Sequence, residues 1–440
     1  MTRIVIKRKI KSFNKIITVD SDKSLSIRSL LIGSQSYGLC KIKNLSQSGD
    51  ILSTIKGLRK LGIKIFFKNK ICYLYGNGLN GFKYKKNISI DAGNSGTFAR
   101  LLLGLIIKSP HEIRLVGDNS LTKRDFKRIA DPLKQFGAKF KLKNKNNLPL
   151  KVIGSEYLKP INYFEKRGSA QCKSSVILAA LNTPGNTIIT AKKSRNHTEL
   201  FLKYLKLPIK VTGKKEYDII KISGENQFKS FDYEIPGDIS SSAFFIVLTL
   251  LSKNSKLRIK NVNINPSRTG FIKIINKMGA NVKFINKRHV CGEKLADVFV
   301  KSQNNFKPIN CPVKLNSNAI DEFLIIFLLA TKASGVSSFK KLEELNKKES
   351  PRLKLASNIL KKIGVKVKLG PGSIKIFGNP KLSINKKILI NNYYKDHRIF
   401  MTSVIAALSL GGKWTIEDKE SHISSFPSFL RILQKIGYNF

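Results

Sequence analysis

The sequence lacks any apolar run long enough to cross a membrane. A membrane-spanning helix needs about 20 consecutive apolar residues. The longest apolar runs here, AFFIVLTLL from residue 243 and FLIIFLLA from residue 323, are far shorter and suit core helices. The opening MTRIVIKRKI also lacks the apolar block of a signal peptide. We therefore expect no membrane partner and a cytoplasmic location.

Cysteine is scarce and scattered. The chain has only five cysteines, none of them in a CxxC pair, at positions 40, 72, 172, 291 and 311. This spacing excludes a zinc motif of the common kinds and suggests no disulfide framework. A reducing compartment and a fold without a structural metal are expected.

Acidic residues are few, with 28 Asp and Glu against 81 Lys and Arg, so the net charge is +53. Such a charge can indicate nucleic-acid binding through counterion release. The lysines, however, are spread along the chain without a long basic block, and we see no aromatics interleaved with arginine. We favour a lysine-rich solvated surface with no nucleic-acid partner, whose positive field attracts small polyanions.

One pattern occurs six times along the chain: the end of an amphipathic helix, a glycine, then a strand. A glycine after the last helical turn takes the left-handed conformation that ends many helices. The third copy lacks the glycine and has Pro208 instead. The copies are LRKLGIKI at 58, LKQFGAKF at 133, LKYLKLPIKV at 202, INKMGANV at 275, LKKIGVKV at 360 and LQKIGYNF at 433.

Six apolar helices alternate with these copies, and each begins in a cluster of polar residues. The repeating unit of about 70 to 80 residues is too long for a common solenoid, so we predict an α/β (α+β) fold of two domains with three units each. Pro236 and Gly237 separate units three and four, and the first strand, residues 3–10, has no unit of its own. We predict one domain from residues 1–19 plus 239–440 and another from 20–238, with two chain crossings.

The polar helix starts raise a chemical question, because the first backbone N–H groups of a buried helix need partners. A side-chain cap or a bound anion can supply them. For GDISSS at 237 we favour simple capping. For DKSLSIR at 22 and GNSGT at 93 we favour an anion site, because Lys23 and Arg28 add positive charge and Gly96 leaves the backbone open.

Further charged groups cluster in the second half. Asp321 stands at the start of an apolar helix, where it is either a cap or a functional acid. Lys348 and Arg352 share a face if their segment is helical. His397, in KDHR at 395, is more typical of a structural histidine. No P-loop, HExxH motif or nucleophile elbow occurs.

Taken together, these stretches resemble the 5-enolpyruvylshikimate-3-phosphate synthase family from end to end. The resemblance is carried by DKSLSIRSLLIGSQSYG, GNSGTFARLL, GDNSLTKRDFKRIADPLKQFGA, GSAQCKSSVILAAL, SRNHTE, PGDISSSAFF, NPSRTGFIKIINKMGA, IDEF, KKESPR and DHRIFM. It implies a two-domain inverse α/β barrel-like fold of six βαβαββ-type units, with the active site in the interdomain cleft. It also implies a monomer.

The resemblance implies transfer of the enolpyruvyl group of phosphoenolpyruvate to the 5-hydroxyl of shikimate 3-phosphate, with release of phosphate. The reaction passes through a tetrahedral intermediate and serves chorismate and aromatic amino acid biosynthesis. No metal or organic cofactor is needed. The family is inhibited by glyphosate, a phosphonate that occupies the phosphoenolpyruvate pocket.

Roles for particular residues follow from the resemblance alone. Asp321 is implied as the base on the 5-hydroxyl, and Glu349, with Lys23 as the alternative, handles the methylene proton. The residues implied to bind shikimate 3-phosphate are Lys23, Ser24, Arg28, Ser169, Ala170 through its backbone, Gln171, Arg195, Asp321 and Lys348. Those implied to bind phosphoenolpyruvate are Lys23, Asn94, Gly96, Arg124, Gln171, Arg352 and Arg398.

Two positions depart from the family pattern. Pro351 replaces an acidic residue, and Ser424 stands where some relatives place a lysine. The sister transferase acting on UDP-N-acetylglucosamine is the nearest alternative, but it usually carries a cysteine in the loop that is VGDNSLTKR here. A basic nucleic-acid-binding protein built from repeated α/β units is the alternative of another class.

Overall fold

The computed structural model describes residues 2–440, which form two compact units. Unit 1 comprises Met1–Asp20, Pro236–Arg288 and Lys294–Phe440, and unit 2 comprises Ser21–Ile235 and His289–Glu293. Each unit has its own hydrophobic core. The inclusion of His289–Glu293 in unit 2 was not expected from the sequence.

Unit 2 contains three sheets with strand orders β14-β3-β5-β4, β6-β7-β9-β8 and β10-β11-β13-β12. Its strands are β3 (Tyr37–Lys43), β4 (Lys64–Lys68), β5 (Ile71–Asn77), β6 (Ile88–Asp91), β7 (Ile113–Val116), β8 (Lys139–Lys143), β9 (Asn147–Ile153), β10 (Asn162–Glu165), β11 (Asn186–Lys192), β12 (Ile209–Gly213), β13 (Tyr217–Ser223) and β14 (Asp232–Glu234). Its helices are α1 (Lys23–Gly33), α2 (Gly49–Lys60), α3 (Gly96–Leu105), α4 (Asn119–Thr122), α5 (Lys127–Gln135), α6 (Ala170–Leu181) and α7 (His197–Tyr204).

Unit 1 contains sheets of order β16-β17-β15-β2, β18-β20-β19 and β1-β22-β21. Its strands are β1 (Arg3–Ile6), β2 (Asn14–Ile17), β15 (Lys256–Asn263), β16 (Val282–Val290), β17 (Glu293–Lys301), β18 (Val336–Phe339), β19 (Val367–Gly370), β20 (Ser373–Phe377), β21 (Lys387–Ile390) and β22 (Lys413–Glu417). Its helices are α8 (Ile239–Leu251), α9 (Gly270–Lys277), α10 (Asn316–Ala319), α11 (Phe323–Ala330), α12 (Arg352–Lys362), α13 (His397–Leu410) and α14 (Phe429–Lys435), with 3-10 turns η1 (Val313–Leu315), η2 (Glu343–Lys347) and η3 (Lys419–Ser424).

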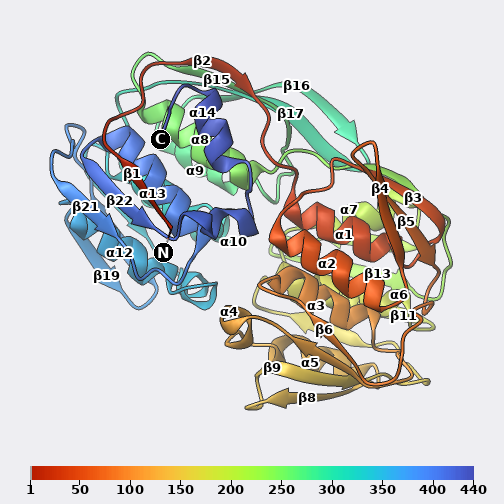
Figure 1. Cartoon of the computed structure of the whole chain (residues 1–440). Coiled ribbons are helices and arrows are strands. Elements are labelled where there is room, and N and C mark those ends of the chain that lie inside the picture. Colours follow the sequence, from red (N-terminus) through yellow and green to blue (C-terminus); the bar gives the residue numbers. More distant parts are fainter. Residues whose placement is uncertain (1) are drawn as a thin grey trace. The chain divides into compact units, whose positions relative to one another are not determined.

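The predicted α/β fold of six repeated units is confirmed. Each of the six sequence repeats contributes one almost fully buried helix. These helices are α1, α3 and α6 in unit 2 and α8, α11 and α13 in unit 1. In unit 2, α3 packs against both α1 and α6 (Figure 1). In unit 1, α8, α11 and α13 pack against one another. Strands of the same unit pack against these helices, among them β5 on α1 and β15 on α8.

The six amphipathic helices end as the repeated glycine predicts. Gly62, Gly137, Gly279, Gly364 and Gly437 all have φ between 83° and 118°. In the third copy, Lys206 takes this left-handed conformation with φ 57°. Pro208 is therefore not the residue that ends the helix, because the left-handed turn comes two residues earlier.

Candidate active site

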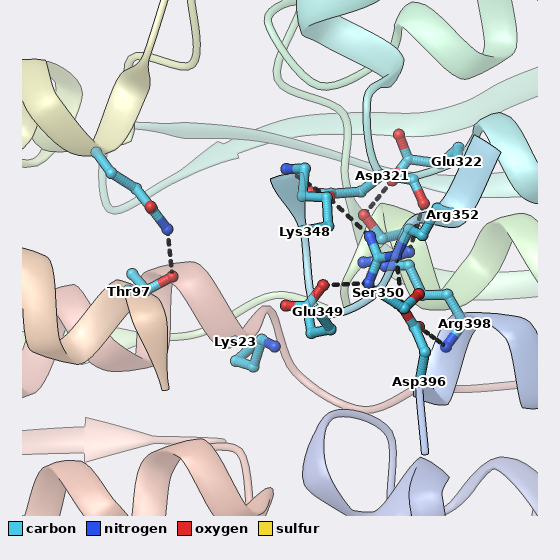
Figure 2. A network of polar contacts seen from close by, with 12 residues as sticks. Lys23, Thr97, Asp321, Glu322, Lys348, Glu349, Ser350, Arg352, Asp396 and Arg398 are labelled. Atoms are coloured by element: carbon cyan, nitrogen blue, oxygen red, sulfur yellow. Dashed lines mark hydrogen bonds and ion pairs between the residues drawn. The ribbon is translucent and has the colours of Figure 1, made fainter. Parts of the chain in front are cut away.

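Asp321 lies at the centre of a cluster of charged side chains in unit 1 (Figure 2). Lys348 donates a hydrogen bond from Nζ to Asp321 Oδ1 at 3.3 Å, and Nη1 of Arg352 lies 3.7 Å from the same oxygen. Arg398 donates from Nη1 to the backbone carbonyl of Asp321 at 2.8 Å. Three cations thus surround one acid that was predicted to act as a base.

Asp321 is not placed at the start of the apolar helix itself. It lies between α10 and α11, and α11 begins only at Phe323. Its carboxylate contacts basic side chains, which favours the reading as a functional acid over that as a cap. The side chain is 16% exposed, so a small ligand can reach the carboxylate.

Besides its 3.7 Å contact with Asp321, Arg352 is held by two further carboxylates. Its Nε donates to Asp396 Oδ2 at 2.9 Å and its Nη2 to Asp396 Oδ1 at 3.3 Å, while Nη2 also pairs with Glu349. Ser350 donates to Asp396 Oδ2 at 2.7 Å, and the backbone N–H of Arg398 donates to Oδ1 at 2.9 Å. Asp396 therefore fixes two of the three predicted phosphoenolpyruvate arginines, Arg352 by its side chain and Arg398 by its backbone.

Arg352 and Asp396 each stabilise the charged form of the other. Burial opposes the charge of Arg352, but Asp396 and Glu349 raise its pKa above the ordinary value. Burial likewise opposes ionisation of Asp396, but Arg352 and His397 hold its pKa below the ordinary value. Both groups are therefore charged at neutral pH, and the arginine fork is fixed in orientation.

The segment around Lys348 is not one helix. Lys348 has an extended backbone with ψ −150°, and α12 begins at Arg352, directly after Pro351. The condition under which Lys348 and Arg352 would share a helix face is therefore not met, although both side chains still reach Asp321. Proline is tolerated because it stands at the cap, where a missing N–H breaks no helical hydrogen bond.

The sequence did not single out a second buried chain of polar contacts in unit 1. Arg268 donates from Nη2 to Asp238 Oδ1 at 3.0 Å and to Ser240 Oγ at 2.7 Å, and Ser240 donates in turn to Glu322. Asp238 also caps α8 by accepting from the N–H of Ser240, as favoured for GDISSS. Glu322 follows Asp321 directly, so this chain fixes the backbone that carries the candidate base.

In unit 2, the start of α1 combines a cap with two basic side chains. Asp22 accepts from the N–H of Leu25 at 2.9 Å, so the cap is a carboxylate. Lys23 Nζ pairs with Asp50 at 2.9 Å. Arg28 is buried and donates to Thr198 Oγ1, to the carbonyl of Ser24 and to Ser174 Oγ.

The start of α3 brings Asn94, Gly96 and Arg124 together. Arg124 donates from Nη2 to Asn94 Oδ1 at 3.2 Å, and Asn94 donates to Asp118 at 2.5 Å. A methyl group added to Gly96 would lie only 2.8 Å from Arg124 Nη1. Glycine is therefore needed here for the close approach of the arginine, since its own φ is not in the left-handed region.

The start of α6 carries Ser169, Ala170 and Gln171. Ser169 caps the helix by accepting from the N–H of Cys172. Gln171 accepts from Arg100 Nη1 at 2.5 Å and donates to Thr97 at 3.0 Å, as the dashed line in Figure 2 shows for Thr97. Both partners belong to α3, so Gln171 is oriented by the GNSGT helix.

Two further basic residues of unit 2, Arg195 and Lys173, differ in burial and in their contacts. Arg195 lies half-buried in the loop between β11 and α7, three residues before the Thr198 that holds Arg28. Lys173 is fully buried and pairs with Glu199 at 2.6 Å, so its role is to link α6 to α7. Ser424 stands where some relatives have a lysine, and its hydroxyl donates to the carbonyl of Ser421.

The described residues hold no group of three or more His, Cys, Asp or Glu side chains that could bind a metal ion. All five cysteines are free thiols. Among residues 2–440, no helix has the length and apolar character that crossing a membrane requires.

Comparison with known proteins assigns the chain to a family. A family model described as EPSP synthase (3-phosphoshikimate 1-carboxyvinyltransferase) matches residues 7–433. The 3-phosphoshikimate 1-carboxyvinyltransferase of Ruthia magnifica is 37% identical over 100% of this chain and 99% of its own length. The protein of that name from Thermodesulfovibrio yellowstonii is 38% identical over 99% of this chain and 100% of its own.

Solved structures agree with this result. EPSP synthase from Acinetobacter baumannii matches with a TM-score of 0.86 and 32% identity, covering 99% of this chain and 98% of that one. The enolpyruvyl transferase NikO from Streptomyces tendae matches with a TM-score of 0.74 at 12% identity over 99% of this chain and 98% of that one, which shows a shared fold alone.

Proposed function

Because the chain belongs to the EPSP synthase family, we propose that it transfers the enolpyruvyl group of phosphoenolpyruvate to the 5-hydroxyl of shikimate 3-phosphate. Inorganic phosphate is the second product. The reaction class is that of a 3-phosphoshikimate 1-carboxyvinyltransferase, and the product leads to chorismate and the aromatic amino acids. The observation that supports it most is the Asp321 cluster, in which one acid lies among Lys348, Arg352 and Arg398.

The addition step needs a base and an acid. Asp321 accepts the proton of the 5-hydroxyl while the hydroxyl oxygen attacks C2 of phosphoenolpyruvate. Glu349 or Lys23 gives a proton to the methylene carbon. The tetrahedral intermediate then loses a methyl proton as its C2–O bond to phosphate breaks. The methyl proton returns to the group that supplied it, and the proton held by Asp321 leaves with the phosphate. Both groups are thus restored, and the proposed steps use no metal or organic cofactor.

The basic side chains bind the anionic groups of both substrates. Arg124, Arg352 and Arg398 hold phosphoenolpyruvate, because an arginine fork matches the geometry of carboxylate and phosphate. Asn94 and Gly96 allow Arg124 to lie against the start of α3. Asp396 is a positioning residue, because its carboxylate orients Arg352 and Arg398 without needing to touch the ligand.

We assign the binding of shikimate 3-phosphate to residues near the starts of α1 and α6 and to Lys348. Arg28 is oriented by hydrogen bonds to the Thr198 and Ser174 hydroxyls, and the family resemblance assigns its guanidinium to the substrate. Gln171 is fixed by Arg100 and Thr97, which gives it one orientation toward the ligand. The remaining proposed contacts, given by the family resemblance, are Lys23, Ser24, Ser169, Ala170, Arg195, Asp321 and Lys348.

A phosphate-release assay tests this function. Phosphate should appear only when phosphoenolpyruvate and shikimate 3-phosphate are both present, and omission of either should abolish the signal. UDP-N-acetylglucosamine serves as the control acceptor. Release with that acceptor, and none with shikimate 3-phosphate, would support the sister transferase instead.

A further inference from the structure

One sheet of unit 2 exposes aromatic rings beside lysines. In β5 the side chains alternate, so Leu74 is buried while Tyr73 and Tyr75 face the other side of the sheet. The strand register places Phe66 of β4 opposite Tyr73 and Lys64 opposite Tyr75. Helices α1 and α2 pack on the buried side, which leaves these side chains on the solvent side.

The three rings form one continuous group. Phe66 and Tyr73 are stacked with ring centroids 5.2 Å apart and planes 9° from parallel, and Phe66 lies 6.2 Å from Tyr75. Lys64 Nζ lies 5.5 Å from the centre of the Tyr75 ring. Tyr75 is 40% exposed, which is high for so large an apolar group. We call this set, with the exposed Lys41, Lys43 and Lys68 beside it, the aromatic face.

A basic groove adjoins the edge strand of the aromatic face. Its volume is about 400 Å³, and it is lined by Arg59, Lys60, Gly62, Lys83, Tyr84, Lys85, Ile88 and Ser89. Arg59 donates to the carbonyl of Ile65 at 2.7 Å, which places the groove next to β4. No acidic residue lines it, and within residues 2–440 none of its four cations forms an ion pair. The groove therefore carries positive charge that the fold itself does not neutralise.

At the opposite edge of the same sheet, acidic side chains offset the lysines. Asp232 and Glu234 of β14 are exposed and lie opposite Lys41 and Lys43. A polyanion therefore meets less net positive charge at this edge than at the β4 edge. The charge distribution therefore favours binding of a polyanion at the β4 edge of the aromatic face, next to the groove.

We propose that the aromatic face and the basic groove bind single-stranded RNA. Unpaired bases stack on the Tyr75, Tyr73 and Phe66 group, and the phosphates contact Lys64 and the groove cations. A duplex does not fit this chemistry, because its bases are already stacked and cannot reach the rings. An acidic peptide would use the lysines but would leave the rings without partners.

This proposal revises the expectation that the chain has no nucleic-acid partner. Aromatics interleaved with basic side chains were the feature that would have favoured RNA binding, and the segment KIFFKNKICYLY at 64–75 contains them with lysine in place of arginine. Only the pairing of β4 with β5 places Phe66, Tyr73 and Tyr75 on one surface. None of the residues proposed for enolpyruvyl transfer lies in this sheet.

Fluorescence anisotropy with a labelled RNA of about 12 nucleotides, near the size of one single-strand site, tests the proposal. The Tyr73→Leu/Tyr75→Leu variant keeps apolar cover on the sheet but removes two stacking rings. It should bind RNA at least about tenfold more weakly, since each stacked base is worth about that factor. Binding of inorganic polyphosphate, which has charge but no bases, should stay unchanged.

Two matched controls locate the site. Phe164→Ala removes an exposed ring from β10, in another sheet of unit 2, and should leave RNA affinity unchanged. Lys64→Gln should lower the slope of log affinity against log salt by about 0.7, the value for one contact to a single strand, whereas Lys413→Gln should not. Turnover of the small substrates, equal in all variants, shows that each is folded.

Three outcomes would overturn the proposal. They are wild-type RNA affinity in the double leucine variant, an equal loss in Phe164→Ala, and an equal loss for polyphosphate. A duplex of the same length that binds as tightly as the single strand would also contradict it, because stacking would then contribute nothing.

Discussion

Asp396→Asn is the substitution with the clearest structural consequence. In the native protein, Oδ2 accepts from Ser350 at 2.7 Å and from Arg352 Nε at 2.9 Å, and Oδ1 accepts from the Arg398 N–H at 2.9 Å and from Arg352 Nη2 at 3.3 Å. Each carboxylate oxygen thus faces two donors. An asparagine must place its NH₂ group toward one of these donor pairs, so two hydrogen bonds are lost whichever way it turns.

The expected loss of stability is about 3–5 kcal/mol, the range for removing one partner of a buried ion pair. Arg352 is only 1% exposed, so water cannot take the place of the lost Asp396 charge beside it. Glu349 still pairs with Nη2 of Arg352, which keeps the loss within that range. An exposed ion pair would contribute less than about 1 kcal/mol.

Urea unfolding followed by tryptophan fluorescence measures this change. Trp414 is the only tryptophan of the chain, and it is fully buried in unit 1, which also contains Asp396. Its signal therefore reports the unfolding of the affected unit. Glu344→Gln, at an exposed ion pair with Lys347 in the same unit, is the matched control and should change the free energy of unfolding by less than about 1 kcal/mol.

The stability difference should depend on pH in one direction. The pKa of Asp396 is lowered in the folded state, so its contribution is complete above the unfolded pKa of about 3.9. It is lost as pH falls through the still lower folded pKa. The difference in free energy of unfolding between wild type and variant should stay constant from pH 7 to pH 5 and become smaller below about pH 4. A loss below 1 kcal/mol at pH 7 would refute the reasoning.

Three other substitutions test the proposed site. Asp321→Asn should keep substrate binding and lower kcat by about 10²–10⁴-fold, the usual effect of losing a positioned base; near-normal turnover would contradict its role. Arg124→Ala should weaken phosphoenolpyruvate by about 1.5–3 kcal/mol, as for a charged hydrogen bond, and equal weakening of shikimate 3-phosphate in separate titrations would count against it. Gly96→Ala pushes a methyl group to 2.8 Å from Arg124 Nη1, so the guanidinium must shift. Both the inhibition constant of glyphosate and the KM for phosphoenolpyruvate should rise, the former more, and no change in either would show that Gly96 does not line the pocket.

Local sequence signals predicted the repeat well. A glycine follows five of the six amphipathic helices and indicates a left-handed turn, and this signal depends only on neighbouring residues. The polar starts of the buried helices are equally visible, and Asp22, Ser95, Ser169, Asp238 and Asp396 cap them. For the starts at Asp22 and Ser95 the sequence favoured an anion site over a cap, and the structure shows a side-chain cap at both. Capping acts over three residues, so it can be recognised without the fold.

The contacts that orient the site could not be predicted from the sequence. Arg352 and Asp396 are 44 residues apart, and Arg100 and Gln171 are 71 apart. Asp396 was therefore noticed only as a neighbour of His397, and Arg268 and Glu322 were not singled out at all. Lys348 and Arg352 converge on Asp321 through an extended turn, which periodicity does not reveal.

The central claim is an enolpyruvyl transfer by addition and elimination, and the fate of the bridging oxygen of phosphoenolpyruvate tests it most directly. With oxygen-18 between C2 and phosphorus, the breaking C2–O bond should carry all of the label into inorganic phosphate, while the three carbons appear as an enol ether on the 5-oxygen of shikimate 3-phosphate. Mass spectrometry of both products decides the question. Label retained in pyruvate, with no enol ether formed, would show simple phosphate hydrolysis and contradict the account.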